Sequence, residues 1–270
     1  MNKIKVVNDN LEICNVSKNI SVEYYRKECL FAINDLKINI KKDSKLDIEV
    51  NLKEETKLNF NINIECNVKL DLNIYVNGKI GKIQYKYTLG ENSLCNINKF
   101  QNVDSIKEMI IVNLNGIGAD IEYNFKTISN NKETYDYHIF HNYKNTISNI
   151  KNNGVCINDG NIIYQVSSFV PKEITECTVN QNNRIINLTN NKCEIKPNLY
   201  IDSYDVEASH SALIGKFSDE EMFYIQSRGI DYNAALKLLI TGFLTSDINN
   251  KKIISYIDKK INKYWRWYFE

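Results

Sequence analysis

The stretch that decides the fold is LNFNINIECNVKLDLNIYV, residues 58–76. Apolar residues occupy every second position from Leu58 to Val76, and Asn, Glu, Lys, Asp or Tyr fill the positions between them. Because successive side chains of a β-strand point to opposite faces, this alternation predicts a strand with one apolar and one polar face. The run is much longer than a typical strand of about 5–6 residues. We therefore expect it to bend at corners.

The same alternation continues in shorter segments along the chain. Asn77-Gly78 and Gly90-Glu91-Asn92 supply turn signals between the first of them. Many short strands separated by Asn and Gly corners suit a β-solenoid, in which successive coils stack their inward side chains into one core. A β-sandwich is the alternative, since alternation alone does not separate the two folds. The further expected strands are residues 109–114, 121–125, 135–141, 147–152, 162–169 and 184–188.

The N-terminal part is less regular. Residues 1–45 mix short β-like runs with a more helical piece at residues 23–36, and continuous alternation begins at Leu46. We therefore divide the chain into an entry segment (1–45), a β core (46–217) and a C-terminal helical subdomain (218–270).

The spacing of apolar residues changes from two to three and four after about residue 217, which indicates helices. Ser218-Asp-Glu-Glu221 has the form of a capping box and predicts a helix from Asp219. Gly229 can close this helix in the left-handed conformation, and Asp231 can cap a second one. We expect Ser246-Asp247 to cap a third helix. Its apolar stripe consists of Ile254, Ile257, Ile261, Tyr264 and Tyr268.

Composition limits the possible functions. With 34 Lys and Arg against 33 Asp and Glu, the net charge of +1 gives no reason to expect nucleic acid or an acidic membrane as a partner. The 7 cysteines are scattered and include no C-x-x-C pair, which argues against a zinc ribbon or disulfide scaffold and for reduced thiols. No signal peptide or membrane-spanning run is visible, so we expect a cytoplasmic protein. The abundance of Asn, Lys and Ile is interpreted as genome composition.

Several short patches occur in a fixed order along residues 110–245. They are Leu114-x-Gly116-x-Gly118-Ala119; His141-x-x-Lys144-Asn145-Thr146-x-Ser148 with Gly154; Asn180-Gln181-Asn182 with Pro197; Asp205-Val206-x-x-Ser209-His210-x-Ala212; Gly215-Lys216; Phe223-Tyr224-x-x-Ser227-Arg228-Gly229-Ile230; and the stretch 235–244. On these residues the chain resembles SufB and SufD, the scaffold proteins of the SUF iron–sulfur cluster assembly system. The resemblance implies a mainly β fold, a right-handed parallel β-helix followed by C-terminal helices. Longer family members carry an N-terminal helical region for which 270 residues leave no room, so we expect a short form.

The resemblance also implies a site. The histidine matching His210 lies at the seam between two scaffold chains, where a nascent iron–sulfur cluster is held transiently and shared with the partner. SufB has a carboxylate after this histidine and a cysteine further upstream, whereas this chain has Ser211 and Asn182. With both SufB-type ligands missing, the chain looks more like SufD. Cys177 and Cys193 flank Asn182 and are candidate substitutes, because a thiolate binds iron well.

Each of these residues also has a purely structural interpretation. His210 would cap a strand end by hydrogen bonding to the backbone, and each cysteine, with Cys156 the weakest candidate, would be a small buried apolar residue. His138 and His141 fall on opposite faces of a strand and cannot chelate one metal ion from it. We expect His141 to be structural.

The C-terminal helices have a second implied role. In the family they bind SufC, an ABC-type ATPase, and we expect docking here while the β-helix dimerises with a SufB-like chain or a second copy. The alternative is that the helices cap the last coil. The residues matching the ATPase interface are Phe223, Tyr224, Ser227, Arg228, Gly229, Leu236, Leu239 and Phe243.

Motifs for catalysis are missing from the sequence. It contains no phosphate-binding Gly-x-x-x-x-Gly-Lys-Ser/Thr loop, no Gly-x-Ser-x-Gly elbow and no His-Glu-x-x-His helix. We therefore expect a non-enzymatic scaffold whose ATP-driven step belongs to a partner. The alternative is a β-solenoid interaction module without metal chemistry, a relative whose ligands have been lost.

Overall fold

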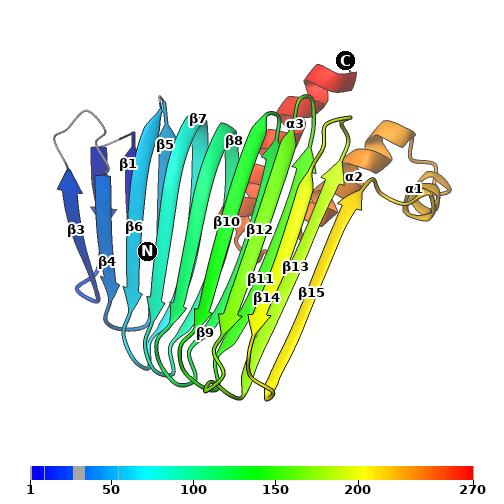
Figure 1. Cartoon of the computed structure of the whole chain (residues 1–270). Coiled ribbons are helices and arrows are strands. Elements are labelled where there is room, and N and C mark those ends of the chain that lie inside the picture. Colours follow the sequence, from blue (N-terminus) through cyan, green and yellow to red (C-terminus); the bar gives the residue numbers. More distant parts are fainter. Residues whose placement is uncertain (1, 9, 27–33, 54, 270) are drawn as a thin grey trace.

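The computed structural model describes the chain except residues 1, 9, 27–33, 54 and 270. The described residues are mainly β (61% strand) and form a β-solenoid of about 7 turns followed by three helices. Figure 1 shows the coils stacked side by side, with the helices at the C-terminal end. The predicted solenoid is confirmed, and the sandwich is not formed.

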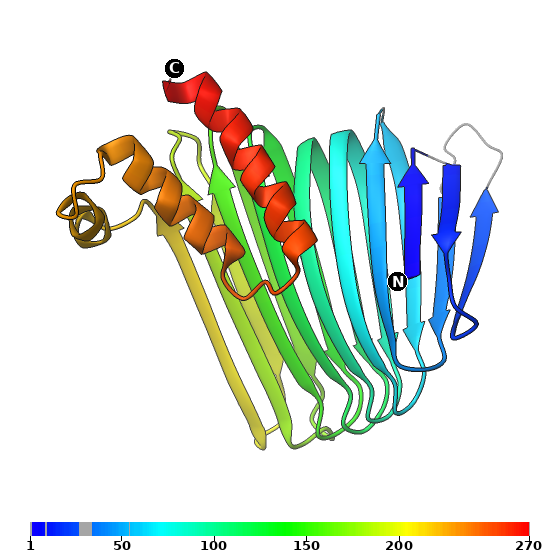
Figure 2. The same cartoon turned by 180° about the vertical axis from the view of Figure 1, so that it is seen from behind.

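Each coil contributes one strand to each of two facing layers. The helix-side layer, over which the helices lie in Figure 2, contains β1 (Asn2–Val7), β5 (Ser44–Leu52), β9 (Asp120–Ser129), β11 (Ile147–Cys156), β13 (Cys177–Asn187) and β15 (Val206–Gly215). The far layer contains β4 (Asn34–Ile40), β6 (Thr56–Ile64), β10 (Lys132–His141), β12 (Asn161–Val170) and β14 (Glu194–Ile201). Two long strands, β7 (Lys69–Leu89) and β8 (Leu94–Leu114), run through both layers. At the N-terminal end, β2 (Asn10–Asn15) and β3 (Ile20–Arg26) pair antiparallel with β1 and β4.

The stretch 58–76 bends as predicted. Strand β6 ends at Ile64, the chain turns through Asn67, and β7 begins at Lys69. The turn signal Asn77-Gly78 behaves differently, because β7 continues through these residues and only changes layer there. A Cβ on Gly78 would lie 2.0 Å from the backbone oxygen of Leu52, and its φ is +144°. A glycine therefore allows this corner without a loop.

Asparagine forms the corners and links the coils. One corner repeats a left-handed residue in consecutive coils: Asn67, Asn92, Gly118, Asn145 and Glu176. Asn and Gly are the residues that enter this region most readily. On the strands, asparagine side chains donate to the preceding coil, as in Asn63 Nδ2 to Asn39 Oδ1 (2.8 Å). The abundance of Asn thus has a structural role that the composition did not reveal.

The expectation of a helical piece at residues 23–36 is wrong at both of its described ends. Residues 23–26 belong to β3 and residues 34–36 to β4, while residues 27–33 lie outside the described part of the chain. Leu36 and Ile38 pair in register with Phe60 and Ile62 of β6, so the core fixes this segment as a strand. Since β1 and β4 extend both layers, the entry segment continues the solenoid. The boundaries at 45/46 and 217/218 stay predictions.

The helices are α1 (Asp219–Gln226), α2 (Tyr232–Thr245) and α3 (Lys251–Phe269). The capping box of α1 and the Asp231 cap of α2 are confirmed, and Gly229 adopts a φ of +83° after α1. The predicted cap of α3 is wrong. Ser246 closes α2, and the side-chain oxygen of Asn250 accepts the N–H groups of Lys252 (2.9 Å) and Ile253 (3.2 Å).

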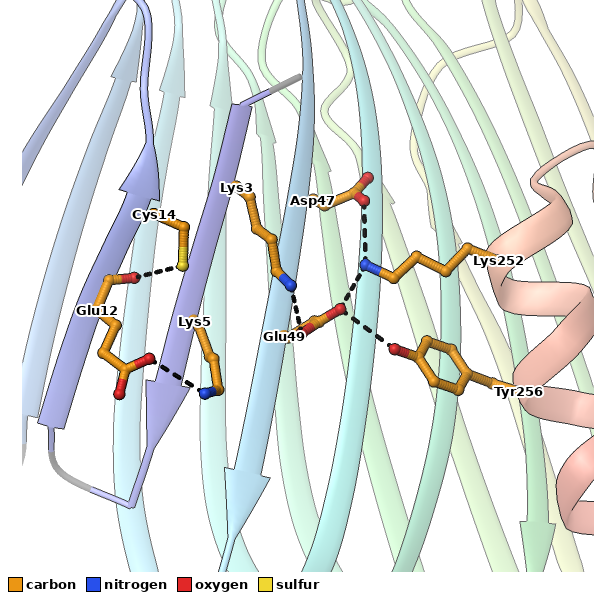
Figure 3. A network of polar contacts seen from close by, with 8 residues as sticks. All are labelled: Lys3, Lys5, Glu12, Cys14, Asp47, Glu49, Lys252 and Tyr256. Atoms are coloured by element: carbon orange, nitrogen blue, oxygen red, sulfur yellow. Dashed lines mark hydrogen bonds and ion pairs between the residues drawn. The ribbon is translucent and has the colours of Figure 1, made fainter.

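A ring contact and a network of polar contacts hold α3 on the helix-side layer, and Figure 3 shows the polar network. The ring of Tyr256 stacks on Tyr75 at 3.8 Å, and its hydroxyl donates to Glu49 Oε1 (3.2 Å). Lys252 forms ion pairs with Glu49 and Asp47. Desolvation acts to raise the pKa of Glu49, but hydrogen bonds from Lys252 and Lys3 outweigh it and lower that pKa. Among the described helices, none combines the length and apolar character needed to cross a bilayer.

Candidate functional site

His210 lies in the middle of β15. This strand is the last one of the helix-side layer, as Figure 1 shows. The in-register neighbour of His210 on β13 is Gln181, which is 2% exposed and faces the interior. In-register neighbours of a parallel sheet share a face, so His210 belongs to the inward row. Its side chain is nevertheless exposed, because no described strand follows β15. The histidine therefore stands at the open end of the solenoid.

The inward row becomes polar as it approaches this end. Ile97, Tyr123 and Ile150 are followed by Gln181 and then His210. The neighbouring inward row also contains two amides, and Asn152 donates to Asn183 Oδ1 at 2.7 Å, but this row has Lys99 further back and ends on Ala212. Large polar side chains are uncommon on the inward face of a core, so Gln181 and His210 distinguish the end of their row from its earlier part.

Gln181 is only half satisfied in its hydrogen bonding. Its Nε2 donates to Ser168 Oγ (2.8 Å) and to the backbone oxygen of Asn198 (3.2 Å). Its Oε1 is buried and has no hydrogen-bond partner among the described residues. A buried acceptor without a donor costs about 1–3 kcal/mol. The row that carries His210 thus contains an open acceptor.

The two positions where SufB-type ligands are missing are neighbours in space. Asn182 on β13 and Ser211 on β15 are in-register partners, and both are exposed. They lie on the outward face, opposite to Gln181 and His210. An amide and a hydroxyl are poor ligands for iron. The pair therefore supplies no obvious substitute for a thiolate or carboxylate.

Cys177 lies at the start of β13, well away from His210. It pairs with Val206, which precedes His210 by four residues, or about 13 Å along a strand. Its thiol is 2% exposed and lies 3.3 Å from Thr146 Oγ1. The same hydroxyl contacts His141 Nδ1 at 2.8 Å. Cys177 is thus part of a buried corner.

His141 completes that corner. Ser148 Oγ lies 2.9 Å from its Nε2, and the ring is fully buried. Burial lowers the pKa of His141 to about 4, so the ring is neutral. His138 lies on the outer surface, with Nε2 3.1 Å from Asp136 Oδ1. The two histidines point to opposite faces, as predicted.

Cys193 lies at the other corner of the coil, before β14. Its Sγ is 3.3 Å from Sγ of Cys156, and both thiols are free. Cys177, Cys193 and His210 therefore do not meet in one chain. Within the described residues, no three His, Cys, Asp or Glu side chains gather where they could hold a metal ion.

The residues proposed for the ATPase interface divide into two groups. Phe223 and Tyr224 are 73% and 62% exposed on α1, which projects beyond β15 in Figure 1. The Arg228 guanidinium lies 5.1 Å from the Tyr224 ring and donates to its hydroxyl (3.2 Å). Next to it, Ser227 donates to the Tyr224 carbonyl oxygen (2.9 Å) and Gly229 ends the helix. We call Phe223, Tyr224 and Arg228 the α1 patch.

The second group packs against the solenoid. Leu236 is 7% exposed, and Leu239 and Phe243 are partly buried in the same cluster. These three side chains cover the outer face of the helix-side layer, whereas the alternative interpretation expected the helices to cap the end of the last coil, which stays exposed at β15. The exposed part of the predicted interface is therefore on α1.

Sequence reasoning missed Arg184, which connects β13, the strand beside His210, to the helices α1 and α2. It lies on β13, three residues after Gln181, and its guanidinium is 3.9 Å from Glu221 of α1. The same group lies 5.3 Å from the ring of Phe243 on α2. A lone arginine in a strand gives no sequence signal for a partner about 40–60 residues away.

A row of stacked rings on the far layer was also missed. Phe140, Phe169 and Tyr200 belong to consecutive coils, and their ring centroids are 4.9 Å apart. Tyr200 at the end of the row is 54% exposed. The only signal in the sequence was an aromatic residue near the end of each strand, which becomes a row once the register is known.

Comparison with known proteins gives the family. The family model for the SUF system FeS cluster assembly SufBD core domain matches residues 48–243. The iron–sulfur cluster assembly protein SufD of Bacillus subtilis is 27% identical over 137 residues, which are 48% of this chain and 31% of that protein. A SufBD family protein of Mycobacterium leprae is 34% identical over 87 residues (32% of this chain, 22% of that protein). SufD of Escherichia coli is 42% identical over 50 residues (18% and 12%).

These alignments cover at most about a third of the three relatives' own length. The family model, by contrast, extends from β5 into α2 and so includes most of the solenoid, its open end and the α1 patch. The chain therefore belongs to the SufB/SufD family of the SUF iron–sulfur cluster assembly system, and its named relatives include SufD proteins.

Proposed function

We propose that this chain is a scaffold subunit of a SUF-type complex, which holds a nascent iron–sulfur cluster as transient cargo without catalysing a reaction itself. The observation that carries the proposal is the position of His210, exposed on the inward row of the last coil beside the open acceptor of Gln181. An imidazole suits iron as a ligand. The proposed compartment is the cytoplasm, where thiols are kept reduced.

The second scaffold chain would pair with the free edge of β15. An exposed strand edge presents unpaired backbone groups that another strand can satisfy. A SufB-like chain would bring the thiolate and carboxylate that Asn182 and Ser211 do not provide. A second copy of this chain would double His210 without adding a thiolate at the seam. The mixed pair is therefore the proposed cluster-building form.

The ABC-type ATPase would dock on the α1 patch. Phe223, Tyr224 and Arg228 are the kinds of side chain that dominate protein interfaces. Arg184 links α1 and α2 to β13, the strand next to His210. A movement of α1 on ATP binding would thus pull on the coil beside the proposed cluster site.

Coexpression tests the partners. The full chain is produced with a SufB-like scaffold and a SufC-like ATPase, and the complexes are isolated through a tag on this chain. Phe223→Ala with Tyr224→Ala should release the ATPase and keep the second scaffold. Tyr204→Ala, which removes a still more exposed aromatic ring outside α1, is the control and should keep both. Failure of the unmodified chain to retain the ATPase would contradict the docking proposal.

Anaerobic reconstitution tests the cluster site. The isolated complex is incubated with ferrous iron and sulfide, and the charge-transfer absorption of the product is recorded. His210→Ala should remove most of this absorption while the chains stay associated, whereas His138→Ala on the outer surface should not. Equal absorption in both variants would exclude His210 as a ligand.

A second candidate function is an interaction module without metal chemistry. Asn182 and Ser211 favour it, since these outward positions beside the His210 row carry an amide and a hydroxyl where the resemblance to SufB would place metal-binding groups. In that case this chain would still assemble with the second scaffold and the ATPase. No such complex, however, would develop charge-transfer absorption that depends on this chain.

A further inference from the structure

Two cysteines that the proposed function leaves unused lie in contact inside the solenoid. Cys156 and Cys193 are separated by 37 residues along the chain, and their Sγ atoms are 3.3 Å apart. Both are free thiols, 0% and 7% exposed. A disulfide bond requires the sulfur atoms to approach to about 2.0 Å, so little movement separates this contact from a bond.

The fold holds the two thiols at one corner of successive coils. Cys156 ends β11, and the chain then turns into β12. Cys193 immediately precedes β14, whose Glu194 pairs with Ile163 of β12. Both side chains belong to the main core cluster, which fixes them on either side of the stacked corner. The contact therefore follows from the register of the coils.

The surroundings make the two thiols chemically unequal. The hydrogen bond from Cys156 lowers the pKa of Cys193 to about 7, with a further contribution from the backbone of Ile162, although burial opposes the shift. The same contact and burial raise the pKa of Cys156. A thiol with a pKa near ambient pH is the better nucleophile in disulfide exchange. Cys193 is thus the thiol that attacks first, and Cys156 is close enough to attack the mixed disulfide that forms on Cys193.

We propose that Cys156 and Cys193 form a reversible dithiol modification site for low-molecular-weight disulfides. The Cys193 thiolate attacks one sulfur of R–S–S–R, forms a mixed disulfide and releases one thiolate R–S⁻. Cys156 then loses its proton to solvent and attacks the Cys193 sulfur, forming the Cys156–Cys193 bond and releasing the second R–S⁻. The two thiols are oxidised by two electrons, and the small disulfide is reduced to two thiols.

The bond would add a covalent link between coils that are otherwise held by strand pairing, core packing and side-chain hydrogen bonds. It closes a loop that contains β12 and β13, the strand next to His210. Closing such a loop removes conformational freedom from the unfolded chain and raises Tm. It also consumes the Cys193 thiolate, so an oxidised chain cannot offer Cys193 as a metal ligand. This inference does not depend on the proposed function.

Redox titration of the full chain tests the site. The protein is equilibrated with reduced and oxidised glutathione at a series of ratios, quenched with an alkylating reagent, digested and analysed by mass spectrometry. The expected product is a cross-linked pair of peptides containing Cys156 and Cys193, lighter by two hydrogen atoms and without bound glutathione. The Tm of the oxidised full chain, measured without a reducing agent, should be several degrees higher than that of the reduced chain.

Serine variants assign the two roles. Cys156→Ser should stop at a stable glutathione adduct on Cys193, and Cys193→Ser should leave Cys156 reduced. Cys177→Ser removes another buried thiol and should behave like the unmodified chain. The proposal is overturned if unmodified protein keeps both thiols at every glutathione ratio, retains glutathione on Cys193, or links either cysteine to a different one. These measurements do not involve cluster assembly, so they test the dithiol site independently of the proposed scaffold function.

Discussion

Lys99 and Glu108 form an ion pair inside the solenoid, and both side chains are completely buried. Lys99 lies on the first half of β8 and Glu108 on the second, so one strand carries the two partners into facing layers. The ammonium group lies 4.4 Å from the ring centroid of Tyr85. Desolvation lowers the pKa of Lys99 and raises that of Glu108, while their mutual attraction opposes both shifts. Each charge therefore depends on the other.

Removing one partner should be costly. Lys99→Met leaves the Glu108 carboxylate buried without its cation and should lower the free energy of unfolding by about 3–5 kcal/mol. The double variant Lys99→Met with Glu108→Leu should recover most of this loss, because no buried charge is left. Denaturant unfolding measures both, with exposed Lys107→Met as the control. Equal losses in the single and double variants would contradict the interpretation.

Glu133 should make stability depend on pH. Burial raises its pKa from 4.5 to about 7, although Tyr135 and Thr127 donate to its Oε2 at 2.7 and 2.8 Å. The folded chain holds this proton more tightly than the unfolded chain. The stability that Glu133 contributes through this proton is therefore fully present below about pH 4.5 and is lost as pH rises to about 7. Glu133→Gln should remove this loss, worth on the order of 1–3 kcal/mol at pH 8. The difference between the variant and the unmodified chain, measured by denaturant unfolding from pH 4.5 to 8, should grow with pH; a constant difference would be evidence against it.

Gly78 and Gly242 should respond oppositely to alanine. A Cβ on Gly78 meets the backbone of Leu52 and forces a positive φ on a side chain. We expect Gly78→Ala to cost at least about 2 kcal/mol. Gly242 has open space around it in α2, and Gly242→Ala should stabilise by about 0.5–1 kcal/mol. Thermal unfolding of the two variants side by side checks the prediction, which fails if Gly78→Ala is neutral.

The contact of α3 with the solenoid should depend on Tyr256 more than on Lys252. Tyr256→Ala removes the ring stacked on Tyr75 and should cost about 2 kcal/mol locally. The Lys252 side chain is 37% exposed, so solvent screens its ion pairs and Lys252→Ala should cost at most about 1 kcal/mol. Hydrogen exchange of the α3 amides measures both, with exposed Ser255→Ala as the control. The reverse order of the two losses would show that charge, not stacking, holds the helix.

Local patterns carried much of the fold. The alternation at 58–76 specified inward and outward faces, and the form Ser218-Asp-Glu-Glu221 specified the start of α1. Both depend only on residues close in sequence, where the period of the chain and the capping hydrogen bonds are fixed. The cap of α3 could not be chosen in the same way, because both Ser246-Asp247 and Asn250 are suitable residues and packing of Ile253 and Ile257 decided between them.

The sequence by itself therefore determined the alternating strands and the helical C-terminal part, and the ordered patches along residues 110–245 indicated the family and, through it, the solenoid. Only the tertiary structure decided that His210 stands beside Gln181 at the open end, that Cys193 meets Cys156 and not Cys177, and that Lys99 meets Glu108 in the core. The physical reason is that alternation fixes the face on which a side chain lies. The number of residues in each coil, which sets the register, fixes its neighbour.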